Sequence, residues 1–177
     1  MVVVAALIVA GVLPVSAQDR PPNIQDLSLA DLMKVEVTSV ARKAQPVGKT
    51  AAAIFVITAD EIRRSGATTL PDLLRFVPGV FVGQVNANTW SIASRGFASI
   101  YGNKLLVLVD GMSLYDPASG GVTWDQHYLP LDMIARIEVV RGPGGSLWGA
   151  NAINGVINII TKPADQSTGL VMSTRLD

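Results

Sequence analysis

The sequence has no cysteine, a single histidine and few charged residues. The lack of cysteine excludes disulfide scaffolds and thiolate metal sites. With only His127, a histidine-cluster metal site or a histidine-based catalytic triad is disfavoured. Charged residues make up 16% of the chain, and the 14 basic groups balance the 14 acidic ones. Zero net charge gives no general attraction to nucleic acid. A length of 177 residues suits one domain with a short appendage.

The apolar residues are concentrated at the N-terminus. Met1–Ala17 contains no charge and 14 apolar residues. Val2–Leu13 has the length of a signal-peptide core and is too short to span a bilayer. Small residues precede Gln18, so we expect residues 1–17 to be a signal peptide. The segment lacks lysine and arginine, which departs from that pattern and leaves two alternatives, a start further upstream and a buried N-terminal strand or helix.

Residues 18–48 read as a flexible N-terminal segment with two adjacent prolines and scattered charges. Within it, Val35–Val40 alternates β-branched and polar residues, which is typical of an extended strand. Such a strand can be an edge strand of the same domain, or it can pair with the sheet edge of a partner. Composition alone favours the edge strand.

The compact part, residues 49–165, begins with an apolar run. Residues 53–57 predict a strand buried on both faces. Thr58 and Glu61 form a capping-box pattern for a helix that Gly66 ends. Thr69 caps a second helix, which carries its apolar residues at helical spacing and ends at 78–79. These apolar residues are Leu70, Leu73, Leu74 and Val77.

Strand patterns dominate the rest of the domain. Strands are predicted at 80–82, 90–95 and 104–109, with Asp110-Gly111 turning into a returning strand, Met112–Tyr115. Pro130 is expected to open a short helix through Ala135. Two buried strands follow, at 137–140 and 153–161, the latter with Gly155 as a bulge. This order predicts an α+β fold with a small mixed sheet and short helices.

The glycine-rich stretch 141–151 follows a strand and therefore calls for a comparison with phosphate-binding loops. A P-loop anchored on Gly144 and Gly149 needs lysine and a hydroxyl residue at the next two positions, where Ala150 and Asn151 stand. A dinucleotide loop needs a small residue where Leu147 stands. The stretch is instead typical of tight turns that let backbone approach a neighbour.

Three loops are rich in glycine, asparagine, serine and aromatics: 83–89, 97–103 and 116–127. Amides beside Tyr101, Tyr115 and Trp124 can bind a ligand by hydrogen bonds and stacking. Solvated turns are the alternative, and composition alone favours them. No carboxylate pair at a catalytic spacing stands out.

The segment IEVVRGPGGSLWGANAINGVINIITK, Ile137–Lys162, resembles the closing motif of the plug domain of TonB-dependent outer-membrane receptors. Three other segments resemble that family in the same order, and the resemblance covers Val35 to Pro163. They are TLPDLLRFVPGV (Thr69–Val80), SRGF (Ser94–Phe97) and LVLVDGMSLY (Leu106–Tyr115).

The resemblance implies a plug inside a barrel of about 22 strands in the bacterial outer membrane. Such receptors import a small nutrient chelate, such as a ferric siderophore, haem or cobalamin, without chemistry on it. The resemblance therefore implies no enzyme, no cofactor and no metal ligand set. The implied partners are that barrel and TonB, the inner-membrane energy-coupling protein. It places the energy-coupling box at 35–40, which reverses the preference for an edge strand: Val35, Glu36, Val37, Thr38, Ser39 and Val40.

The resemblance also implies site residues by position. The loops that face the substrate contain Gln84, Asn86, Asn88, Ser99, Ile100, Tyr101 and Tyr115. Arg95, Glu138 and Arg141 stand at strand ends, and we expect them to pair with opposite charges on the barrel wall. Pairing inside the plug is the alternative.

One departure from the family is large. A barrel needs several hundred residues at about ten per strand, whereas 15 follow Lys162. Residues 166–177 match at most the first barrel strand. The sequence therefore predicts a plug whose barrel is missing from this chain, with a plug-only periplasmic binding or signalling module as the runner-up. A secreted enzyme is a third class, disfavoured by the missing site residues.

Overall fold

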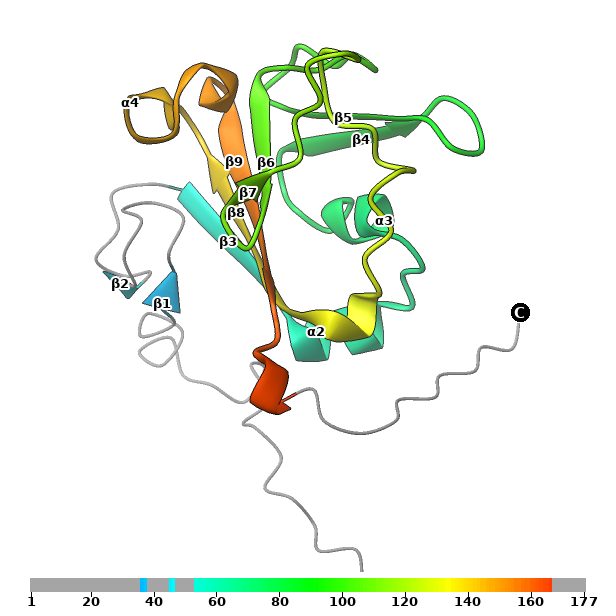
Figure 1. Cartoon of the computed structure of the whole chain (residues 1–177), viewed down its shortest axis with the longest axis vertical. Helices are drawn as coiled ribbons and strands as arrows, with labels where there is room; N and C mark the ends of the chain where they lie inside the picture. Colours follow the sequence, from blue (N-terminus) through cyan, green and yellow to red (C-terminus); the bar gives the residue numbers. More distant parts are fainter. Residues whose placement is uncertain (1–35, 38–44, 47–52, 167–177) are drawn as a thin grey trace, which may run out of the picture.

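The computed structural model describes residues 36–37, 45–46 and 53–166, which form mainly one five-stranded sheet with short helices beside it (Figure 1). The strand order is β3-β8-β9-β6-β7, and neighbours are antiparallel except the parallel β9 and β6. This is the α+β class with a small mixed sheet that the sequence predicted. The strands are β3 (Ala53–Thr58), β6 (Leu105–Val109), β7 (Met112–Ser113), β8 (Ile134–Arg141) and β9 (Gly155–Thr161).

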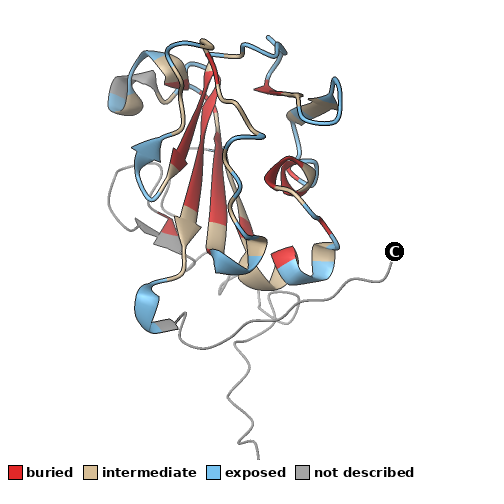
Figure 2. Ribbon diagram, turned by 45° about the vertical axis from the view of Figure 1, so that its right-hand side comes forward, coloured by how far each residue is buried: buried red, intermediate tan, exposed pale blue. Residues whose placement is uncertain are grey.

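Two antiparallel strand pairs lie outside this sheet. One is a hairpin of β4 (Val80–Gln84) and β5 (Trp90–Ser94), which lies on the same side of the main sheet as helix α3 (Figures 1 and 2). The other pairs the two-residue strands β1 (Glu36–Val37) and β2 (Gln45–Pro46).

The central strands are buried on both faces, as the red strands in Figure 2 show. The larger apolar cluster packs the sheet against the helices and β4–β5, and it includes the buried Leu73, Ile137 and Ile157. The smaller cluster lies on the opposite face and comprises Leu106, Leu108, Val140, Ala152 and Val156. Burial of these side chains is the main force that stabilises the sheet.

Strand β3 differs from its prediction. It pairs with β8 alone among the described residues, so it is an edge strand. Only Ile57 is buried, and the other residues are half-buried or exposed. A continuous apolar run does not distinguish a central strand from an edge strand, because the order of strands in a sheet is set by long-range pairing.

The helix ends follow the sequence signals. In α2 (Ala59–Ser65), the Thr58 N–H donates to Glu61 Oε2 at 2.7 Å and the Glu61 N–H donates to Thr58 Oγ1 at 3.4 Å, and Gly66 follows with φ 69°. Helix α3 (Leu70–Leu74) has Thr69 at its N-cap. It ends earlier than predicted, although Val77 beyond it is still buried.

The hairpin at Asp110-Gly111 is confirmed, with positive φ values of 48° and 84°. The returning strand β7 is only two residues long, shorter than the predicted 112–115. Among the described residues β7 pairs with β6 alone. It is therefore an edge strand, and just beyond it the Leu114 N–H still donates to the Val107 carbonyl at 2.9 Å.

The structure corrects two predictions for residues 130–161, one of a helix and one of a bulge. The helix after Pro130 is a single 3₁₀ turn, η3 (Leu131–Met133), because Ile134 already pairs with β9. Gly155 is not a bulge but the first residue of β9, and the register shift lies in β8 between Ile134 and Arg136. Glycine is required at 155 because a Cβ there would collide with the carbonyl oxygen of Val140, and φ is 157°.

The glycine-rich stretch forms short turns between β8 and β9. They are the helix α4 (Gly145–Trp148) and the 3₁₀ turn η4 (Ala150–Ala152), while η5 (Ala164–Gln166) follows β9. A Cβ on Gly144 would lie 3.0 Å from Val156 Cγ2. The close approach of backbone to a neighbouring strand agrees with the interpretation of this stretch as tight turns.

Candidate functional site

Strand β1 contains the two described residues of the predicted coupling segment. Glu36 pairs with Pro46 and Val37 with Gln45, and Val37 is only 1% exposed. Val35, Thr38, Ser39 and Val40 lie outside the described residues. The pairing is antiparallel and internal, as for an edge strand, and within the described ranges it covers two residue pairs. A partner strand that added here would compete with a short ladder.

The β4–β5 hairpin presents Gln84, Asn86 and Asn88, and all three are exposed. The Asn86 Oδ1 accepts hydrogen bonds from the N–H groups of Asn88, at 3.0 Å, and Thr89, at 2.8 Å. Gln84 Nε2 donates to the carbonyl of Ala87 at 3.5 Å. Asn86 therefore holds the tip of the hairpin in shape, while the exposed side chain of Asn88 forms no hydrogen bond within the described residues.

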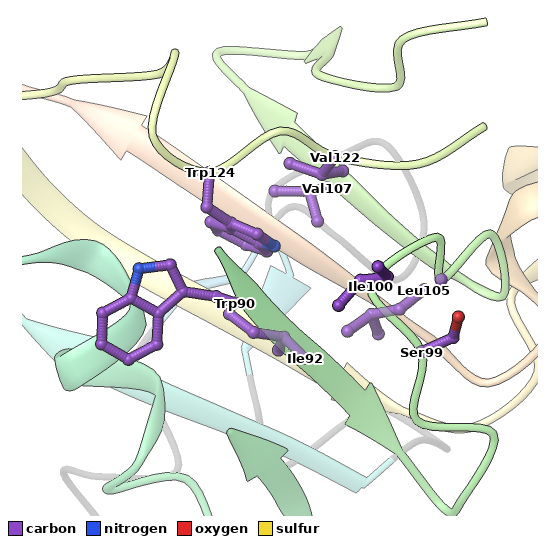
Figure 3. Close-up of a pocket in the computed structure, with 9 residues that line it drawn as sticks. Trp90, Ile92, Ser99, Ile100, Leu105, Val107, Val122 and Trp124 are labelled. Carbon is purple, nitrogen blue, oxygen red and sulfur yellow. The ribbon is translucent and has the colours of Figure 1, made fainter. Parts of the chain in front are cut away.

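The loop 97–103 presents Ser99, Ile100 and Tyr101. The Ser99 Oγ accepts a hydrogen bond from the Tyr101 N–H at 3.1 Å, and Tyr101 is 63% exposed. Ser99 and Ile100 line a space that also touches Trp90 and Trp124 (Figure 3). That space has a volume of about 10 Å³, which holds no more than one water molecule.

Tyr115 begins a loop that Asp116 organises. Tyr115 is half-buried. The Asp116 carboxylate accepts hydrogen bonds from the N–H groups of Ala118, at 2.9 Å, and Ser119, at 3.3 Å. The bond from the Ala118 N–H is the main cause that lowers the pKa of Asp116 below its ordinary value. The role of Asp116 was not predicted, although an aspartate two residues before the amide it binds is a turn signal.

The structure brings only part of the predicted set together. Asn88 lines a cavity with Trp90, Trp124 and His127, while Ser99 and Ile100 line a second, smaller space with the same two tryptophans. Gln84, Tyr101 and Tyr115 line neither space. The sequence pointed to Trp124 as a ligand-binding aromatic, but nothing in it indicated that the start of α3 lies beside this loop.

Arg95 and Arg141 form a relay across three segments. Arg95 Nη2 donates to the carbonyl oxygen of Arg141 at 3.1 Å, and Arg141 Nη1 donates to that of Pro78 at 2.9 Å. Arg95, Gly96 and Phe97 have φ values of 57°, 92° and 59°, a strained run of left-handed residues. Neither arginine forms an ion pair within the described part of the chain, and Arg141 Nε has no hydrogen-bond partner there.

Glu138 lies in a different environment from the two arginines. It is fully buried, and its Oε1 accepts a hydrogen bond from Arg136 Nε at 2.8 Å. Arg136 and Glu138 are two apart on β8, so their side chains share one face of the strand. A fully buried carboxylate has no surface to offer to a barrel wall. For Glu138 the structure therefore favours the alternative, pairing inside the domain.

Two kinds of feature are absent from the described residues. No helix there is long and apolar enough to cross a membrane. Over the same ranges no three histidine, aspartate or glutamate side chains are grouped so that they can hold a metal ion.

A comparison with protein families identifies a family that matches most of the folded part of this chain. The family profile described as TonB-dependent Receptor Plug Domain matches residues 46–156. The chain belongs to this family. The match covers both arginines of the relay, the three loops and most of the main sheet. Residues 35–40 lie outside the matched range.

Named relatives of the plug are transport proteins. The vitamin B12 transporter BtuB of Vibrio vulnificus (strain CMCP6) is 40% identical over 139 residues, which is 77% of this chain and 22% of that protein. The plug thus spans about a fifth of the length of the curated relatives it matches.

Solved structures of receptors share the fold. The ferric yersiniabactin uptake receptor FyuA from Yersinia pestis has a TM-score of 0.51 and 27% identity, covering 63% of this chain and 17% of that one. FpvA of P. aeruginosa, solved with a pyoverdine and iron, has a TM-score of 0.57 over 72% of this chain and 16% of that one. At 22% identity, the second likeness shows the fold alone.

Proposed function

We propose that this chain is the plug of an outer-membrane receptor, which gates the energy-coupled uptake of a scarce nutrient such as a ferric siderophore, haem or cobalamin. The observation that carries the proposal is a plug fold with a relay of two arginines whose charges have no carboxylate partner in the described residues. Arg95 is exposed and Arg141 is half-buried, so both guanidinium groups are accessible to carboxylates of a second structure that packs here.

The barrel wall of the same receptor is the proposed partner of Arg95 and Arg141. Both arginines already donate to backbone carbonyls, which leaves several donors of each guanidinium for carboxylates. The proposed location is accordingly inside an outer-membrane barrel, with the N-terminal segment in the periplasm.

TonB is the proposed partner of residues 35–40. Strand addition needs a chain whose backbone groups can be released at low cost. The described part of the β1–β2 ladder suits that need, because it contains two residue pairs. Burial of Val37 means that release also exposes one apolar side chain.

The decisive experiment is Val37→Pro in the complete receptor. Proline removes an amide donor and fixes φ, so we expect uptake by energised cells to be lost while substrate binding to de-energised cells persists. Val37→Ala is the matched control, which keeps the backbone bonds and should retain most uptake. A panel of iron chelates, haem and cobalamin identifies the substrate beforehand by growth rescue.

Each other result has a clear meaning. Normal uptake by the proline variant shows that this segment is not the coupling strand. Loss of binding as well shows that β1 belongs to the folded domain, as in the edge-strand interpretation. The runner-up, a plug-only periplasmic binding or signalling module, is separated by reading the gene past the codon for Asp177, since a receptor continues into alternating strands of about ten residues.

A further inference from the structure

A cavity of about 290 Å³ lies between three segments that are distant in the sequence. They are the tip of the β4–β5 hairpin, the start of α3 and residues 124–129. This volume is at the lower end for small-molecule sites, so the cavity suits one ring system of a ligand. The side chains used below are Asn88, Trp90, Trp124, Asp125, His127 and Tyr128, and we call this space the ring cavity.

Aromatic side chains form much of the wall of the ring cavity. Trp90 and Trp124 are half-buried, whereas Tyr128 is 89% exposed and so has most of its ring free for contact. The guanidinium carbon of Arg75 lies 5.5 Å from the centroid of the Trp90 ring, a cation–π distance that holds this indole in place. Aromatic walls favour a flat ring, by stacking.

The polar side chains of the ring cavity have unused hydrogen-bonding capacity. Within the described ranges, the side chains of Asn88, Asp125 and His127 form no hydrogen bond or ion pair. Thr69, by contrast, already bonds to Asp72 at 2.7 Å. The free acceptors of Asn88 and Asp125 suit a ligand with N–H or O–H donors on its edge.

The charged residues around the ring cavity favour neutral ligands over anionic ones. No lysine or arginine lines the ring cavity, and residues 111–129 contain neither. Asp125 lies in the wall, and Asp116 is close enough to His127 to interact with it electrostatically. A polyanion would therefore meet the Asp125 carboxylate, while Arg75 beside Trp90 is already paired with Asp72, Nε to Oδ1 at 3.8 Å. Like charges brought together cost binding free energy.

We propose that the ring cavity binds a neutral ring that carries hydroxyl or amide donors, and that it disfavours polyanionic iron catecholates. The inference rests on the proposed function, because the ring is part of the imported nutrient. It divides the candidate nutrients by charge, which neither the fold nor the family does.

Isothermal titration of the complete protein tests this with three probes: cyanocobalamin and maltotriose, which are neutral, and ferric enterobactin, which is polyanionic. We expect one of the neutral probes to bind, and Tyr128→Ala to weaken its binding about tenfold, equivalent to about 1.4 kcal/mol. The control is Phe76→Ala, which removes another exposed ring, 56% exposed and outside the cavity. It should leave binding unchanged.

Asp125→Lys reverses the charge of the wall and should raise the affinity for ferric enterobactin at least about tenfold, because it supplies the missing cation. The proposal is overturned if ferric enterobactin binds the unmodified protein as tightly as the neutral probes do. It is also overturned if neither neutral probe binds, or if Tyr128→Ala and Phe76→Ala behave alike. These titrations need no energised membrane, so a failure of the proposed uptake function appears separately, in the Val37→Pro assay.

Discussion

Strands β8 and β9 and the loops that include residues 84–89, 99–101 and 116–121 are held in shape by different interactions. In the strands, side chains are buried on both faces and packed against helices or turns. In the loops, single side chains accept hydrogen bonds from backbone amides two or three residues further on, as Asn86 and Asp116 do. Local bonds leave the neighbouring side chains exposed. Side chains of these loops can therefore be substituted without disturbing the sheet, as is general for loops on a rigid scaffold.

The largest effect should come from Gly155→Ala, within the packed strands. Its Cβ would collide with the Val140 carbonyl, and φ is 157°. We expect a loss of about 4 kcal/mol or more in the free energy of unfolding, in the range reserved for such clashes. Urea unfolding followed by circular dichroism measures it.

Gly111→Ala is the matched control for that comparison. Its φ is also positive, at 84°, but nothing lies within 4 Å of the added Cβ. It should cost only about 1–2 kcal/mol, the ordinary penalty of a left-handed residue. Equal losses at the two positions would mean that packing around β9 is no tighter than in the turn.

The second-largest losses of stability are expected from two arginines of strand β8, Arg136 and Arg141. Arg136→Ala removes the guanidinium partner of the buried Glu138, and we expect a loss of about 3–5 kcal/mol in the free energy of unfolding of the chain. Arg141→Ala removes a bond to a backbone carbonyl and should cost about 1 kcal/mol.

Arg63→Ala, which breaks an exposed pair with Asp60, serves as the control and should cost at most about 0.5 kcal/mol. In a complete receptor, Arg141→Ala should also lower the urea midpoint at which the plug is retained. An unchanged midpoint there contradicts the proposed pairing with the barrel wall.

The smallest effect should come from the loop residue Asp116. Hydrogen bonds from Ala118 and Ser119 lower its pKa below the reference value of 3.8. A depressed carboxylate pKa stabilises the folded state above the unfolded pKa, and this stabilisation is lost as the pH falls through the folded pKa. The urea midpoint of Asp116→Ala should therefore lie slightly below that of the unmodified chain at pH 7.

The two midpoints should converge in acid, below a pH of about 4. Titration of the Asp116 carboxyl by NMR gives an independent check. A pKa at or above 3.8 in the folded protein would show that the loop does not hold the charged form.

Features that depend on neighbouring residues could be predicted from the amino-acid sequence. The capping box at Thr58 and Glu61, the left-handed end of α2 at Gly66 and the hairpin at Asp110-Gly111 were all predicted and are all present. Each depends on bonds or dihedral angles within a few residues, so a short pattern contains the necessary information. The closing motif at 137–162 likewise indicated the family correctly, because it is a long and continuous run of residues.

Contacts between distant segments, by contrast, are evident only in the folded chain. Folding makes β3 an edge strand, requires glycine at 155 because of Val140, and buries Glu138 completely. It also assembles the ring cavity from three distant segments. These outcomes depend on strand order and on the packing of side chains far apart in sequence, and no local pattern of residues encodes either.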